Sequence, residues 1–203
     1  YVFGDRFVAL NNGAWLSNDG KNWSKTDLPE SGLNSAYQKY VQFNGAIYAL
    51  GSMNGNHERF SIAPKILKTT DFKKWETVAK TSNLPQRVFY GLVVFDNKIW
   101  MLGGFDGNGY HNDVWNSVDG VTWKLVVKGT EWSPRNAGAV TVFKDRIWLI
   151  GGGVIDGTRD PNPNSRNEIW SSADGIEWRR EATRISEDGR YVGGSVAVWD
   201  DKL

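Results

Sequence analysis

The sequence predicts an all-β protein built as a β-propeller of four-stranded blades. Two repeated motifs and the composition support this. One motif places a Trp four residues after an Asp and occurs four times, and the other joins two apolar strands by a short turn. The motifs alternate strictly, so the repeating unit is roughly 50 residues long, a period typical of propellers, solenoids and arrays. Gly at 23 residues and Trp at 11 are both high for 203 residues. They suit tight turns and sheet faces.

The Asp–Trp motif predicts the outer hairpin of each blade. Its copies are WLSNDGKNW (15–23), LKTTDFKKW (67–75), WNSVDGVTW (115–123) and WSSADGIEW (170–178). An Asp side chain accepts hydrogen bonds from nearby backbone N–H groups, and the following Gly can adopt a positive φ. Phe72 replaces this Gly in the second copy, which indicates that the turn tolerates change. Because one calcium or sugar site would not need four copies, we expect a structural role for Asp19, Trp23, Asp71, Trp75, Asp119, Gly120, Trp123, Asp174, Gly175 and Trp178.

The second motif predicts the two inner strands of each blade. Its full copies are VQFNGAIYALGS (41–52), VVFDNKIWMLGG (93–104) and TVFKDRIWLIGG (141–152). A divergent copy, VFGDRFVALNN, covers 2–12, and AVWDDKL at 197–203 begins another. Two-residue turns such as DN favour hairpins. We therefore expect one propeller domain or fragment over 1–203, with units at about 1–31, 32–83, 84–131 and 132–187 and the first strand of another at 188–203.

The paired glycines Gly103–Gly104 and Gly151–Gly152 follow apolar strands and precede a polar loop, an aromatic residue and a downstream Trp. This pattern resembles kelch repeats, in particular bacterial kelch-like proteins, over essentially the whole chain. Gly51–Ser52 and Asn11–Asn12 depart from it, and Trp115 and Trp123 are one residue further apart than is common in kelch repeats. The resemblance implies a ring of about six or seven blades. Because the C-terminal residues repeat the first hairpin, they could instead complete the first blade and close a ring of four blades. We favour the interpretation that the chain is part of a larger ring.

Propeller geometry predicts where a binding site would lie. Loops between the second and third strands share one face with the blade-to-blade links, and variable loops on a rigid scaffold commonly bind ligands. The longest are at 52–65, 105–113 and 153–168, and three of the links before a first strand carry an Arg. We expect a ligand-binding channel mouth formed by Arg87, Arg135, Arg190, Tyr90, Tyr191, Tyr110, His111, His57 and Arg166. In the alternative interpretation, each link Arg pairs with an acidic neighbour or a carbonyl and fastens adjacent blades.

The charge and composition exclude several function classes. Lys and Arg total 24 and Asp and Glu total 23, so no concentrated basic face for nucleic acid is expected. No apolar run reaches the roughly 18 residues that indicate a membrane span, so we expect no membrane insertion. The absence of Cys excludes disulfides and the Cys-linked tyrosine of kelch-type copper oxidases. The chain starts at Tyr1 rather than Met, and we favour a secreted, periplasmic or cell-surface location.

No metal or other cofactor is predicted. His57 and His111 are the only histidines and belong to different loops, whereas a zinc site needs more ligands. Asp106, Asn108 and Asp113 offer oxygen atoms but lack the spacing of a calcium-binding EF-hand loop.

Two function classes remain open. The favoured one is a binding or interaction module that recognises a protein, a glycan or an anionic ligand, with further blades or a second copy as other partners. The alternative is a carbohydrate-active enzyme, similar to propeller-fold sialic-acid epimerases, mutarotases or sialidases. The enzyme would need a carboxylate or His that converges with the link arginines and has a perturbed pKa.

Overall fold

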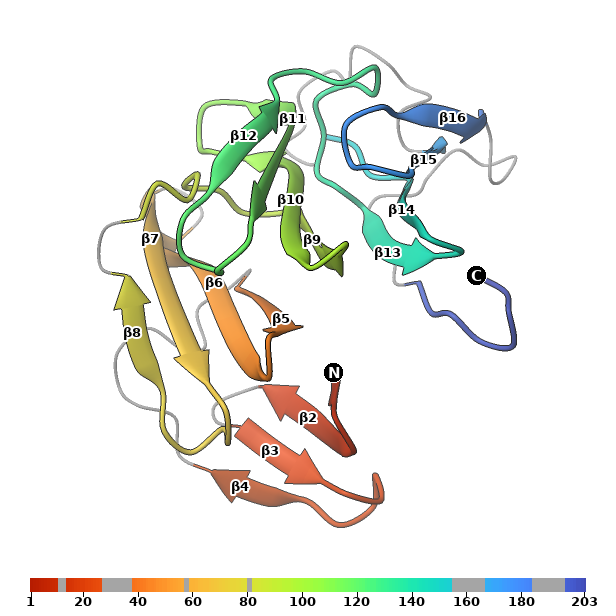
Figure 1. The fold of residues 1–203 in the computed structure, drawn as a ribbon. Helices are drawn as coiled ribbons and strands as arrows, with labels where there is room; N and C mark the ends of the chain where they lie inside the picture. The colour runs from red at the N-terminus through yellow and green to blue at the C-terminus, as the bar shows by residue number, and fades with distance from the viewer. Residues whose placement is uncertain (11–13, 27–37, 57–58, 80–81, 155–166, 184–195) are drawn as a thin grey trace. The chain divides into compact units, whose positions relative to one another are not determined.

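The computed structural model describes all residues except 11–13, 27–37, 57–58, 80–81, 155–166 and 184–195 (Figure 1). The described residues form four antiparallel sheets of four strands each, and the strands of each sheet follow one another in chain order. The predicted all-β propeller fold is therefore confirmed at the level of its blades. The chain divides into two compact units, Tyr1–Gln86 and Arg87–Leu203. Within the described residues, no helix could cross a membrane.

Each compact unit contains two blades. In the first unit, blade 1 consists of β1 (Val2–Phe3), β2 (Arg6–Leu10), β3 (Ala14–Ser17) and β4 (Ser24–Thr26), and blade 2 of β5 (Lys39–Phe43), β6 (Ala46–Asn56), β7 (Arg59–Thr69) and β8 (Glu76–Ala79). In the second unit, blade 3 consists of β9 (Gly91–Phe95), β10 (Lys98–Phe105), β11 (Tyr110–Ser117) and β12 (Lys124–Val127), and blade 4 of β13 (Ala139–Phe143), β14 (Arg146–Ile150), β15 (Ile169–Ser172) and β16 (Arg179–Ala182).

The turns between first and second strands have the geometry that the sequence predicts. Asp96 and Asn97 both have positive φ angles, 48° and 52°, as a type I′ hairpin turn requires. Near the C-terminus, Asp200 and Asp201 have φ angles of 47° and 56°, and Trp199 pairs with Lys202 across them. The predicted start of another hairpin at 197–203 is thus present as a short turn.

We expected a variable loop at 52–65. This prediction is wrong, because β6 and β7 continue to pair through most of these residues. The pairing shifts by one residue after Leu50 and then runs from Ser52 opposite Ala63 to Asn56 opposite Arg59. Residues such as Phe60 and Ile62 have a high preference for strands, and they extend this hairpin beyond the length of its counterparts.

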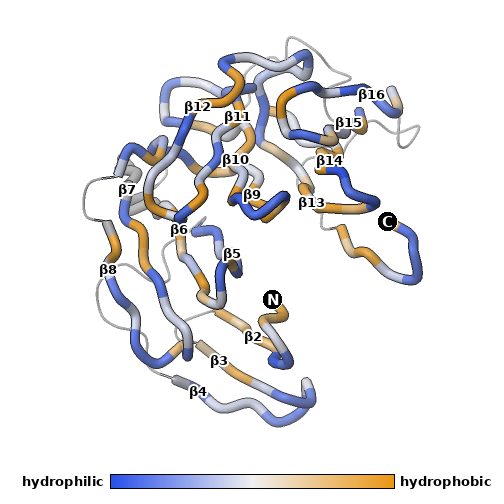
Figure 2. The backbone as a smooth tube through the Cα atoms, viewed as in Figure 1, coloured by the Kyte–Doolittle hydropathy of each residue, from blue (hydrophilic) through white to orange (hydrophobic). Residues whose placement is uncertain are grey.

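Each unit is held together by an apolar cluster between its two blades. In the first unit the cluster joins Phe3, Val8, Ala14 and Leu16 of blade 1 to Ile47, Ala49, Leu67, Phe72 and Trp75 of blade 2. In the second unit it joins Trp100, Leu102 and Val114 of blade 3 and the link residues Trp132 and Ala137 to Ile147, Leu149, Trp170 and Trp178 of blade 4. Figure 2 shows that the strands carry most of the apolar residues and the connecting turns most of the hydrophilic ones.

Candidate functional site

The four Asp–Trp turns use their polar groups internally. In blade 3, Asp119 Oδ1 accepts the N–H groups of Val121 and Thr122, both at 2.7 Å, and Ser117 Oγ accepts the N–H of Gly120 at 2.9 Å. The same hydrogen bonds recur around Asp19, Asp71 and Asp174. Because these carboxylates accept hydrogen bonds from the turns' own backbone, the turns are built as scaffold.

These hydrogen bonds also determine how the turn carboxyls titrate. The backbone N–H groups hold the pKa values of Asp19 and Asp71 below the ordinary range. Partial burial raises the pKa values of Asp119 and Asp174, but the same N–H groups lower them by more, so the net shift is again downward. All four turns therefore favour a charged Asp.

Two of the predicted channel-mouth arginines are buried in ion pairs. Arg87 is only 7% exposed, and its guanidinium donates to the carbonyl of Gly103 at 3.3 Å and to Asp113 Oδ2 at 2.7 Å. Trp115 Nε1 donates to the same Asp113 oxygen at 2.9 Å. Burial raises the pKa of the Asp113 carboxyl, but the bond from Arg87 and the bond from Trp115 lower it by more, and the pKa falls overall.

Arg135 repeats this arrangement one blade later. Its guanidinium donates to the carbonyl of Gly151 at 3.1 Å and to Glu168 Oε2 at 2.8 Å, and Trp170 Nε1 donates to that same oxygen at 3.1 Å. Arg135 has no exposed surface. The link arginine thus holds a carbonyl and an acidic side chain of the blade that the chain enters.

The backbone of Arg135 is bound to the preceding blade. Its N–H donates to the carbonyl of His111 at 3.1 Å, and its carbonyl accepts the N–H of Gly104 at 3.0 Å. Gly103 and Gly104 permit this close approach, since a Cβ on Gly103 would lie 2.9 Å from the carbonyl oxygen of Arg135. The backbone of Arg135 therefore binds blade 3, and its side chain binds blade 4. This arrangement agrees with the alternative interpretation of the sequence, in which a link Arg fastens adjacent blades.

Of the remaining predicted ligand-binding residues, one is buried, two are half-buried and four lie outside the described residues. Tyr90 is buried at 1% exposure and packs beside Gly104. Tyr110 and His111 are half-buried on β11, with the Tyr110 ring 4.9 Å from that of Phe105. The other four predicted residues, His57, Arg166, Arg190 and Tyr191, lie outside the described residues.

The β10–β11 loop has an internal polar network. Asp106 Oδ1 accepts the N–H groups of Asn108 and Gly109 at 2.8 Å each, and its Oδ2 lies 2.9 Å from His111 Nε2. Burial raises the pKa of Asp106, but these N–H groups and His111 lower it further, to about 2. Asp113, the third oxygen ligand considered for calcium, is instead paired with Arg87. Among the described residues, no group of three His, Asp or Glu side chains could hold a metal ion.

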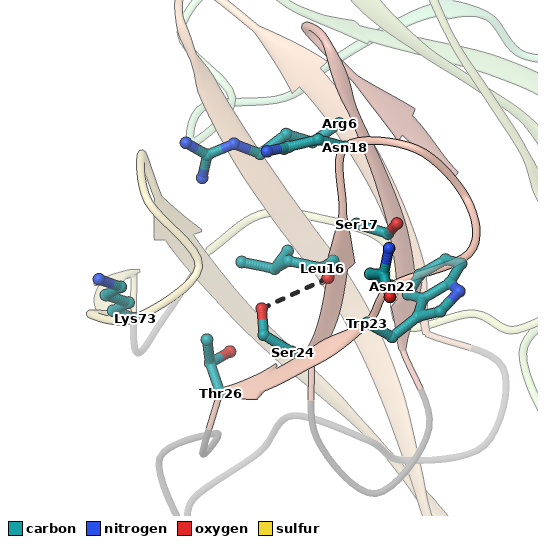
Figure 3. Close-up of a pocket in the computed structure, with 9 residues that line it drawn as sticks. All are labelled: Arg6, Leu16, Ser17, Asn18, Asn22, Trp23, Ser24, Thr26 and Lys73. Atoms are coloured by element: carbon teal, nitrogen blue, oxygen red, sulfur yellow. Dashed lines mark hydrogen bonds between the residues drawn. The ribbon is translucent and has the colours of Figure 1, made fainter.

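Sequence reasoning missed a pocket in the first unit, on the side of the short turns (Figure 3). Its volume is about 450 Å³. Blade 1 and the β7–β8 turn of blade 2 line it with Arg6, Leu16, Ser17, Asn18, Asn22, Trp23, Ser24, Thr26 and Lys73. Trp23 is 41% exposed, whereas Trp75 and Trp178 at the matching positions are 9% and 7% exposed. The only sequence signal was the pair of amides flanking Asp19 and Gly20, where the other copies carry different residues.

A second pocket of about 300 Å³ lies on blade 2. It is lined by Lys68, Thr69, Thr70, Asp71, Lys74 and Glu76. Two lysines are balanced there by two carboxylates, so this pocket has no excess of either charge.

Comparison with known proteins identifies the fold. A family model described as "DUF6242 beta propeller domain" matches residues 1–188. The solved structure titled "Structure of YjhT" is similar, with a TM-score of 0.67 and 15% sequence identity. The match covers 91% of this chain but only 66% of that one, so this chain spans somewhat less than two thirds of the YjhT chain. The curated proteins contain no match to this sequence.

Proposed function

Since this chain belongs to the DUF6242 beta propeller domain family, we propose that it is a binding module with kelch-like repeats. Its ligand is a protein, a glycan or an anionic compound, and the recognition surface lies on the second unit around the β10–β11 loop. The kelch-like assignment is supported by the role of the paired glycines, because Gly103 and Gly104 leave room for the link that carries Arg135.

The observation that carries the proposal is the hydrogen-bonded pair of Asp106 and His111. Both side chains are about one third exposed, at 32% and 31%, and their nitrogen–oxygen distance is 2.9 Å. This loop does not recur in the other blades. Because Asp106 also binds two backbone N–H groups, the loop is held in one conformation before a ligand arrives, and such preorganisation reduces the entropy cost of binding.

The state of the link arginines supports binding over catalysis. A carbohydrate-active enzyme would need a carboxylate facing the substrate beside these arginines. The carboxylates found there, Asp113 and Glu168, are instead paired with Arg87 and Arg135 and are 7% and 3% exposed. Arg87 and Arg135 and their carboxylate partners are therefore engaged in holding the blades.

A glycan array combined with a screen of small anions tests this proposal. We expect at least one ligand whose binding weakens about tenfold in both Tyr110→Ala and His111→Ala, because each removes a partly exposed side chain at the start of β11. Lys124→Ala, on the exposed part of β12, serves as the matched control and retains binding. Ligands that bind all variants equally well, or a complete absence of binding, would overturn the proposal.

A further inference from the structure

The pocket of the first unit carries an excess of positive charge. Arg6 begins β2, Lys73 lies in the β7–β8 turn, and both line the pocket. Among the described residues neither is in an ion pair, and no carboxylate lines the pocket. Asp71, the acid nearest to Lys73 in the sequence, accepts the N–H groups of Lys73 and Lys74 through its Oδ1 and attracts the Lys73 ammonium without forming an ion pair with it. The two cationic groups are therefore placed to attract an anion.

The cationic groups occupy one end of the pocket. Figure 3 shows the guanidinium of Arg6 and the ammonium of Lys73 on the same side as the Leu16 side chain, with Trp23 at the opposite side. A ligand that fills this space has its negative charge near Arg6 and Lys73 and a second, uncharged part that extends towards the indole. With a volume of about 450 Å³, the pocket has room for such a second part.

The remaining polar groups suit a ligand with hydroxyl groups. Thr26 Oγ1 shares its single proton between the carbonyls of Ala14 and Phe72, at 3.2 and 3.3 Å, and Ser24 Oγ donates to the carbonyl of Leu16 at 3.4 Å. Hydroxyls whose protons point to the main chain present their lone pairs to the pocket, so they accept hydrogen bonds from a ligand. Inorganic anions donate few such bonds, whereas a sugar donates several.

The amides and the indole complete this chemistry. Asn18 carries both donors and an acceptor. Asn22 Nδ2 donates to Asp19 Oδ2 at 2.8 Å, which leaves its carbonyl oxygen and second N–H for a ligand. The exposed Trp23 offers an apolar ring face. The matching positions in the second unit are Val118 and Thr122 in blade 3 and Ala173 and Glu177 in blade 4. The combination is therefore particular to blade 1 and is not a consequence of the repeat.

We infer that this pocket binds an acidic saccharide, with the acid group held by Arg6 and Lys73 and the hydroxyl groups by Asn18, Asn22, Ser24 and Thr26. The site goes beyond the function proposed above. It lies in the other unit of the chain and shares no residue with the β10–β11 loop, so either proposal can fail alone.

Titration of the chain with D-glucuronate, D-glucose and inorganic sulfate, followed by NMR, tests the inference. The signal to follow is the indole Nε1–H of Trp23, which donates to the carbonyl of Gly20 beside the pocket. We expect a saturable shift with D-glucuronate and about tenfold weaker binding of both D-glucose and sulfate, since each lacks one half of the recognised chemistry.

Neutral variants of the two cationic residues provide the second measurement. Arg6→Gln and Lys73→Gln should each weaken D-glucuronate binding about tenfold, the loss of one charge-assisted hydrogen bond. Lys21→Gln is the matched control, because Lys21 occupies in blade 1 the turn position that Lys73 occupies in blade 2 but does not line the pocket. No shift with D-glucuronate, equal affinity for sulfate, or unchanged binding in both variants would overturn the inference.

Discussion

The interface between blades 1 and 2 and the interface between blades 3 and 4 differ in which of two matching positions holds the large residue. Between blades 1 and 2, the small Val8 of the second strand shares a cluster with the large Phe72 of the next blade's turn. Between blades 3 and 4, the matching residues are Trp100 and Gly175, and the Trp100 ring occupies the space in which a Cβ of Gly175 would lie. In each interface one of the two positions thus holds a large residue and the other a small one, as close packing of a protein interior favours.

The two interfaces also differ in their links. Arg135 and Glu168 form a fully buried ion pair in the second unit, whereas Ser35 and Lys65 occupy the matching sequence positions in the first. The first unit instead has a cluster of aromatic rings, in which Phe72 and Tyr40 lie 6.3 and 6.4 Å from Trp75. Among the described residues, the first interface combines apolar packing with a hydrogen bond from Thr26 to the carbonyl of Phe72, whereas the second combines packing with a buried charge pair.

The largest expected effect comes from removing the buried cation between blades 3 and 4, Arg135. Arg135→Met keeps an apolar stem but leaves the Glu168 carboxylate, which is 3% exposed, without its closest partner. Breaking a buried pair in this way destabilises a protein by about 3–5 kcal/mol. Urea unfolding followed by Trp fluorescence measures the loss.

The double variant Arg135→Met/Glu168→Gln shows whether the buried charge is responsible. Because it removes both charges, it should recover a large part of the stability that Arg135→Met alone loses. If the double variant is as unstable as the single one, the loss comes from packing or from the missing bonds to main-chain carbonyls, and the distinction drawn between the two links fails.

A smaller effect should follow from adding one methyl group at the turn of blade 4. In Gly175→Ala the new Cβ would lie 2.7 Å from Cε3 of Trp100, and the φ of 75° is unfavourable for Ala. Overpacking and a left-handed conformation together cost about 3 kcal/mol. Thermal unfolding of the variant measures this cost.

Gly20→Ala is the matched control in blade 1. Gly20 has a φ of 73°, but its nearest neighbour, the Phe7 ring, would be 3.7 Å from the new Cβ, an ordinary contact. We expect only the conformational cost, about 1 kcal/mol. Equal destabilisation by the two substitutions would mean that Trp100 moves aside and that the pairing of sizes has no energetic weight.

These interfaces also show what could be predicted from the sequence. The hairpins, their turns and the blades follow from local patterns, because Asp–Gly and Asp–Asn turns and alternating apolar residues are short-range signals. The partner of Arg135 could only be named as an acidic neighbour or a carbonyl, since Glu168 is 33 positions away and is selected by tertiary packing. Phe72 was interpreted as evidence that the turn tolerates change, but its side chain is buried in the apolar cluster between blades 1 and 2.

The pocket of the first unit was missed for a related reason. It combines Arg6 with Lys73, which belong to different blades and are brought together only by the packing of those blades. It also lies among the short turns, whose repetition led us to expect scaffold alone. A search for residues that depart from the repeat consensus, here Asn18 and Asn22, would have been more informative than the lengths of the loops.

The smallest expected effect concerns the turn Asp, which is present in the second blade of each unit. The pKa values of Asp71 and Asp174 are lowered in the folded chain. Their contribution to stability is therefore fully present above the unfolded-state pKa of about 3.9 and is lost as the pH falls through the lower folded-state value. Asp71→Asn and Asp174→Asn should each make unfolding less sensitive to acid below pH of about 4, and by similar amounts. Urea unfolding at several pH values measures this effect. If only one of the two variants loses part of its sensitivity to acid, the turn Asp does not contribute equally to the stability of the two units.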